Sequence, residues 1–172
     1  MRQLIFCLAL LTSIQLSADT IGDVEYALPS KNWKQENAVV PQGSESIVYL
    51  DATQANGPPN EFFIAHKNDQ PAGSFETAAL EKAISFGFPG MTIKVTPLKK
   101  NDYDVLYEWT AMQDGKEKMF GMMRVFARQG DTVILQYLTQ DPTKKENARK
   151  VWVPILEQAH VTTQKEKEKE KK

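Results

Sequence analysis

The chain has 172 residues, of which 41% are hydrophobic and 25% are charged, and its formal net charge is −1 at pH 7. This length and composition predict one globular domain with a substantial buried core, and they leave little room for a second domain. The nearly balanced charge argues against the strongly basic surface of a nucleic-acid-binding protein, so no nucleic-acid partner is predicted.

The first 18 residues show the features of a secretory signal peptide in the expected order. Arg2 supplies the positive charge, an apolar run extends from Leu4 to Leu11, and small residues lead to a predicted cleavage site after Ala18. The apolar run is too short to span a bilayer, so we expect a periplasmic or secreted mature chain with no transmembrane segment. A buried N-terminal strand or helix is the alternative.

The single cysteine, Cys7, lies within this predicted signal peptide. Phe6 stands where a lipoprotein signal has a small residue, so we do not expect Cys7 to be lipidated. The mature chain would therefore contain no thiol, which excludes disulfides, cysteine nucleophiles and cysteine-ligated zinc. No cofactor is predicted.

Short strands are predicted in the first part of the mature chain. They cover residues 23–28, 46–51 and 61–66. Pro29 ends the first strand, and the turn after it holds Trp33. A helical pattern then extends over residues 74–86, with Ser74 as the predicted N-cap and Gly87 close to the end.

The next segment predicts an antiparallel meander. Its strand-like runs, joined by short polar turns, cover residues 92–98, 104–112, 118–128 and 132–139. Asp114-Gly115 and Gly130-Asp131 occupy positions where hairpin turns are needed, because glycine readily accepts the positive φ of such turns.

A second helix is predicted to begin at Thr143. An apolar stripe supports this helix, and Pro154 within the stripe should bend it, because proline removes one helical hydrogen bond. The predicted fold class is therefore α+β, with an antiparallel sheet flanked by helices in an α/β/α sandwich. The predicted domains are a signal peptide at residues 1–18, one globular domain at 19–163 and a charged Lys/Glu tail at 164–172.

The segment KMFGMMRVFAR, residues 118–128, contains three of the six methionines. Because side chains alternate along a strand, Met119 and Met123 share one face and Met122 lies on the other. Met119 and Met123 would be about 13 Å apart on an extended strand, too far for this strand alone to build a Cu(I) site. A central strand with apolar groups on both faces is the favoured interpretation, and methionine-based copper binding is the alternative.

The order of elements resembles the PsbP-like fold. The resemblance rests on the Pro-x-x-x-Trp turn from Pro29 to Trp33, the VILQYLTQD strand of the meander and a final helix after Thr143-Lys144-Lys145, and it covers residues 22–160. This family includes photosystem II extrinsic subunits, a Ran-binding nuclear import factor and many small exported bacterial proteins. The resemblance implies a non-enzymatic binding or assembly role, with a protein partner.

A candidate binding site is predicted from charges within the meander. Glu108 interrupts an apolar strand, and Arg124 and Arg128 share one face of the next strand, so a cross-strand pair between Glu108 and Arg124 is expected. In the functional interpretation, Arg124 is the bidentate donor of a polar patch that docks an acidic or hydroxyl-bearing ligand, with Trp109 in a nearby aromatic platform. The alternative is a structural ion pair and a buried core.

No catalytic or metal site is predicted. His66 and His160 are far apart in the sequence, neither has a metal-type partner nearby, and no hydrolase or nucleotide-binding motif occurs. We expect an exported, non-enzymatic binding or accessory protein of the bacterial envelope. The alternatives are a protein secreted to act on external targets, an unconventional hydrolase that uses Glu108 or His66, and the copper-binding protein.

Overall fold

The computed structural model of the chain describes residues 18–30, 32–37, 42–53, 60–73, 75–128 and 130–162. The predicted signal peptide, except for Ala18, and the predicted Lys/Glu tail lie outside these residues. Strands and helices follow one another as β1 Ala18–Ile21, β2 Val24–Ala27, β3 Trp33–Asn37, β4 Ser44–Asp51, β5 Glu61–Asn68, α1 Thr77–Ser85, β6 Thr92–Lys100, β7 Asp104–Gln113, β8 Lys116–Ala127, β9 Thr132–Thr139, the 3-10 helix η1 Pro142–Lys144, α2 Lys145–Gln158 and β10 His160–Val161.

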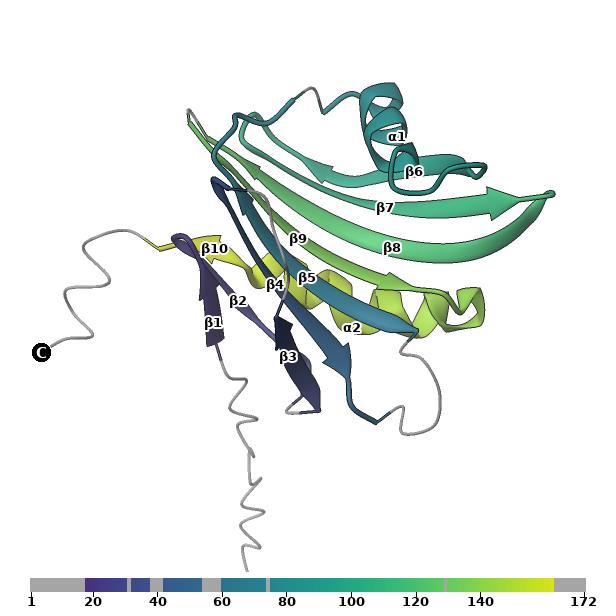
Figure 1. The fold of residues 1–172 in the computed structure, drawn as a ribbon, viewed down its shortest axis with the longest axis horizontal. Helices are drawn as coiled ribbons and strands as arrows, with labels where there is room; N and C mark the ends of the chain where they lie inside the picture. Colours follow the sequence, from purple (N-terminus) through teal and green to yellow (C-terminus); the bar gives the residue numbers. More distant parts are fainter. Residues whose placement is uncertain are drawn as a thin grey trace, which may run out of the picture.

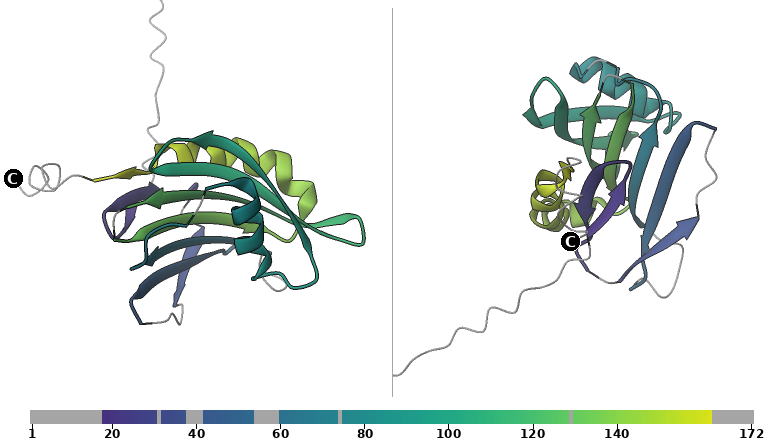
Figure 2. Two further views of the ribbon diagram at one scale, coloured as in Figure 1. Left: turned by 90° about the horizontal axis from the view of Figure 1, so that it is seen from above. Right: turned by 90° about the vertical axis from the view of Figure 1, so that its left-hand side faces the viewer.

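An antiparallel sheet of seven strands forms the centre of the molecule, in the order β3-β4-β5-β9-β8-β7-β6 (Figure 1). The meander β6 to β9 joins the β4–β5 pair because β9 lies between β5 and β8. Helices α1 and α2 cover opposite faces of this sheet, and a small sheet of β1, β2 and β10 packs on the α2 side (Figure 2). The predicted α+β fold is confirmed.

The hairpin between β7 and β8 follows the predicted turn chemistry. Asp114 has a φ of 51° and Gly115 a φ of 74°, so both residues of the turn adopt the left-handed conformation that a tight hairpin requires. The other strands of the meander also lie where the sequence predicts them. The sequence pattern of this segment is therefore sufficient to place its four strands.

Strand β8 is buried on both faces. Met119, Met123 and Val125 pack in the core under α1, whereas Phe120 and Met122 pack in the core under α2. This arrangement confirms the prediction of a central strand with apolar groups on both faces. The sheet thus separates two hydrophobic cores, one for each helix.

Several local features differ from the prediction. Helix α1 begins at Thr77 with Glu76 as its N-cap, and Phe75 packs against the core under α1 before the helix begins; the predicted N-cap, Ser74, lies outside the described residues. Trp33 begins strand β3 instead of lying in a turn. Helix α2 begins after the 3-10 helix η1, and Pro154 lies inside α2. A bend in α2 stays a prediction.

The two edges of the large sheet are strands β3 and β6. In β6 the pairing with β7 shifts register between Pro97 and Lys99, and the lysines of this strand are exposed. In β3 the residues from Lys34 to Glu36 are exposed as well. Neither helix of the described chain has the length and apolar character needed to cross a bilayer.

Candidate functional site

A groove of about 710 Å³ lies between α1 and the part of the sheet formed by β5, β9 and β8. It exists because α1 is a short helix that packs mainly along β6, so it covers only part of its face of the sheet. Phe62 and Ile64 of β5 and Ile134 of β9 consequently stay half-buried although they are apolar.

The floor of the groove follows from strand register. One row across the sheet contains Ile64, Gln136, Met123 and Tyr107, because these residues are direct neighbours on successive strands. The adjacent row begins with His66 and contains Ile134 and Val125. All of these side chains point to the α1 side, so the floor is apolar except for a few polar groups.

Small side chains of α1 leave the space above this floor. Ala79 and Ala83 lie one turn apart on the helix and both line the groove, and Ala83 is exposed. Phe75 and Phe88 flank the helix in the chain and also line the groove. A larger residue at either alanine would occupy the hollow.

The polar groups of the groove carry little charge. Burial lowers the pKa of His66 from its ordinary value of 6.5, so the imidazole is neutral at pH 7. The Tyr107 hydroxyl donates to Met123 Sδ at 2.7 Å, and burial raises the pKa of Tyr107. Among the described residues that line the groove, none carries an Asp, Glu, Lys or Arg side chain.

The predicted partner of Glu108 is replaced by a residue of α2. Arg149 donates from Nε and Nη2 to the two carboxylate oxygens of Glu108, both at 2.7 Å, and Glu108 in turn raises the pKa of Arg149. The expected pair with Arg124 does not form, because Glu108 lies opposite Met122 across the two strands. Glu108 therefore anchors α2 on the sheet.

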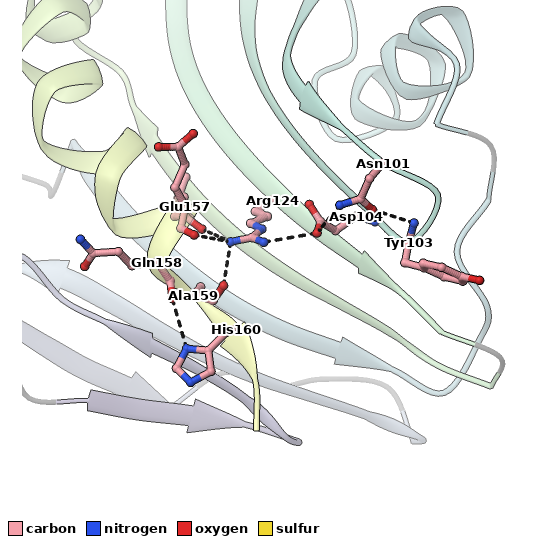
Figure 3. A network of polar contacts seen from close by, with 9 residues as sticks. Asn101, Tyr103, Asp104, Arg124, Glu157, Gln158, Ala159 and His160 are labelled. Carbon is pink, nitrogen blue, oxygen red and sulfur yellow. Dashed lines mark hydrogen bonds and ion pairs between the residues drawn. The ribbon is translucent and has the colours of Figure 1, made fainter. Parts of the chain in front are cut away.

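Arg124 closes the C-terminal end of α2 (Figure 3). Its Nη1 group donates to the carbonyl oxygens of Leu156, Glu157 and Ala159 at 2.6, 3.0 and 2.7 Å, and its Nη2 group donates to Asp104 at 3.3 Å. These carbonyls have no helical donor of their own, since the helix ends there. Most of the guanidinium is thus used inside the fold.

The four predicted site residues do not form one surface. Arg124 and Arg128 border a hollow of about 210 Å³ at the end of β8, where Arg128 also forms an ion pair with Asp23. Glu108 lies under α2, and Trp109 is fully buried on the opposite face of the sheet, against Phe88. A binding role for these residues stays a prediction.

The aromatic residues of the expected platform are also divided between the faces. Tyr107 and Trp109 belong to the core under α1, and Trp33 and Tyr137 belong to the core under α2. His160 is exposed after α2, with its Nδ1 atom 3.2 Å from the carbonyl oxygen of Gln158 (Figure 3). It does not line the groove that contains His66.

Comparisons with known proteins identify the fold. No protein-family model matches the chain, and no curated protein matches it. The solution structure of the cyanobacterial PsbP protein CyanoP from Synechocystis sp. PCC 6803 is similar, with a TM-score of 0.61 and 14% sequence identity over 86% of this chain and 92% of that protein. The chain therefore has the PsbP-like fold.

A second solved structure is similar at a lower level. It is LpqN, described as involved in cell envelope biogenesis of Mycobacterium tuberculosis, with a TM-score of 0.46 and 12% identity over 87% of this chain and 91% of that protein. At 14% identity, the likeness to CyanoP concerns the fold alone, and the groove must be interpreted from the residues of this chain.

Proposed function

We propose that this chain, which has the PsbP-like fold, is an exported, non-enzymatic binding protein whose groove under α1 holds a largely apolar small molecule. The observation that carries this proposal is the groove itself. Its volume of about 710 Å³ and its mainly apolar lining, with a few polar groups, are typical of small-molecule sites.

Incomplete cover of the sheet supports the proposal. Apolar sheet faces are normally buried against another layer, but Phe62, Ile64 and Ile134 remain half-buried beside α1. A ligand in the groove would remove the exposed surface of Ile64 and Ile134, which line it, from water. Burial of apolar area is favourable by about 25 cal/mol per Å², so even a small ligand gains affinity there.

The lining also supports a role in binding rather than catalysis. Among the described residues that line the groove, His66 and Tyr107 are the titratable ones, and the Tyr107 hydroxyl already donates a hydrogen bond to Met123 Sδ. General acid–base catalysis requires positioned groups with suitable pKa values, and one neutral imidazole among apolar residues gives no such pair.

Export is supported by the position of β1. Cleavage after Ala18, as the signal sequence predicts, would leave Asp19 as the first residue, and Asp19 accepts a hydrogen bond of 2.8 Å from the Tyr49 hydroxyl. The mature chain would thus keep three of the four residues of β1. N-terminal sequencing of the protein from periplasmic and culture fractions should give Asp19 as the first residue, and an intact Met1 would contradict export.

A protein partner, which the resemblance implies, stays a prediction. Its identity would distinguish an accessory role in the envelope from a role on external targets.

The groove can be tested with N-phenyl-1-naphthylamine, an uncharged dye whose fluorescence rises in apolar surroundings. The mature chain should bind this dye saturably. Ala83→Trp should abolish the binding, because the indole would fill the groove from its exposed side. Ala78→Trp is the matched control, because Ala78 is exposed on the same helix but does not line the groove.

Equal binding by both variants would show that the dye does not enter the groove. Absence of saturable binding to the unmodified chain would contradict the proposed function. Thermal unfolding of each variant establishes that the fold is retained.

A further inference from the structure

We infer that the ligand of the groove carries an uncharged hydrogen-bonding group, such as a carboxamide or a hydroxyl, that is held by the side chains of Gln136 and His66. This inference rests on the proposed function and specifies the chemistry of the ligand. It assigns a ligand-contacting role to two residues that interrupt an apolar surface.

Gln136 is the first of the two proposed ligand-contacting residues. It lies at the centre of the floor, directly between Ile64 on β5 and Met123 on β8, and it is half-buried. No described residue makes a hydrogen bond to its side chain. An amide in an apolar setting is costly unless it has a hydrogen-bond partner, so the position is well suited to a polar group of a ligand.

His66 is the second proposed ligand-contacting residue. It lies opposite Ile134 on the neighbouring strand and therefore diagonally next to Gln136, at a separation of about 7 Å for such positions. Its imidazole is likewise half-buried and has no hydrogen bond to any described residue. One small polar group placed between the two side chains could contact both.

The hydroxyl groups of the groove are already engaged. The Tyr107 hydroxyl donates to Met123 Sδ, and the Thr132 hydroxyl donates to the carbonyl of Gln70 at 2.8 Å. Asn68 lies at the end of β5. Gln136 and His66 are consequently the hydrogen-bonding side chains available in the middle of the floor.

The charge of the lining determines the charge of the ligand group. A buried ion needs a counter-ion or several hydrogen bonds, and the described lining contains no Asp, Glu, Lys or Arg side chain. His66 is the one group that could acquire a charge, and burial disfavours its protonated form. A carboxylate or an ammonium group would therefore bind less well than a neutral amide of the same size.

Ring-matched competitors can test this chemistry by displacing N-phenyl-1-naphthylamine from the mature chain at pH 7.5. The first competitor, 2-naphthamide, is neutral and forms hydrogen bonds. The second, 2-ethylnaphthalene, is apolar, and the third, 2-naphthoate, is an anion. Gln136→Leu should weaken the binding of 2-naphthamide by roughly five- to tenfold, the value of one hydrogen bond. It should leave 2-ethylnaphthalene within about twofold.

Gln140→Leu is the matched control, since Gln140 is exposed just beyond the end of β9. Gln136→Met provides a second apolar variant of similar shape should Gln136→Leu fail to fold. An equal change in the affinities for 2-naphthamide and 2-ethylnaphthalene would overturn the inference, as would tighter binding of 2-naphthoate than of 2-naphthamide to the unmodified chain.

These results separate the inference from the proposed function. Saturable dye binding with no effect of Gln136→Leu on the amide refutes the hydrogen-bonding role alone. No dye binding to the unmodified chain refutes both.

Discussion

Gly121 is required by the close approach of Trp109. The two residues are opposite each other across β7 and β8, and a Cβ atom added to Gly121 would lie 2.4 Å from Trp109 Cε2. Because Trp109 is fully buried, its indole has little room to move. Gly121→Ala should lower the free energy of unfolding by about 1–3 kcal/mol, measured by urea denaturation.

Two comparisons identify the cause of this loss. Gly130→Ala should be nearly neutral, because nothing lies within 4 Å of the added Cβ atom. In a Trp109→Phe background, Gly121→Ala should cost less, since the smaller ring vacates part of the space. Additive effects of the two substitutions would contradict the steric explanation.

His66 should make stability depend on pH. Burial lowers its pKa in the folded chain below the ordinary value of 6.5 that the unfolded chain retains. As the pH falls from about 6.5 toward the folded pKa, the unfolded chain binds more protons than the folded chain, so stability decreases in this window. The melting temperature should fall between pH 7.5 and pH 5, and His66→Gln should reduce that fall.

If the melting temperature of His66→Gln falls with pH as much as that of the unmodified chain, groups other than His66 cause the fall. His160→Gln is the matched control, because His160 is exposed.

At the residue scale, the sequence predicts which side chains share a face but not what they contact. Alternation places Met119 and Met123 together and Met122 apart, as observed. The partner of Glu108 depends on how helix α2, distant in the sequence, packs on the sheet. The alternation of side chains along a strand does not predict that packing. The groove residues Gln136 and His66 were not predicted as a pair, although each interrupts an apolar strand pattern.

The C-terminal end of α2 depends on Arg124 from β8. Three carbonyl oxygens at the helix end and the carboxylate of Asp104 accept hydrogen bonds from this one guanidinium. Arg124→Met should lower the free energy of unfolding by about 2–4 kcal/mol, because these buried acceptors would lose their donor. Chemical denaturation followed by circular dichroism measures this change.

Lys150→Met is the matched control for this experiment, because Lys150 is an exposed residue of the same helix. An effect of similar size at both positions would show that a general loss of positive charge, and not the cap of α2, is responsible. Arg124→Lys should give an intermediate result, since a lysine ammonium lacks the planar fork of donors.

At the element scale, the long strands with clear turns were predictable, and among the short strands β2 alone was predicted. The strand β9 was predicted with its observed bounds, and the other meander strands differ by a few residues. Strands β1, β3 and β10 were not predicted, because segments of two to five residues contain little periodic pattern, and these three lack the proline stop that marks the end of β2. Their conformation depends on pairing with distant parts of the chain.

In the molecule as a whole, stability should decrease from the centre of the sheet to its margins. Every residue of β8 from Met119 to Phe126 is buried, whereas β3 and β10 are short and largely exposed. Backbone amides of β8 should therefore exchange with deuterium only through nearly global unfolding, and those of β3 and β10 through local opening. Hydrogen exchange measured by mass spectrometry gives this order, and equal protection throughout would contradict it.

The two exposed edges of the large sheet have a consequence for solubility. An open strand edge offers unpaired backbone groups to another copy of the chain and invites aggregation. Pro97 has no N–H group to offer, the register shift beside it distorts the edge, and repulsion between neighbouring lysines opposes the approach of a second β6. These features of β6 should limit edge-to-edge association of two copies through this strand, although the sheet is not closed into a ring.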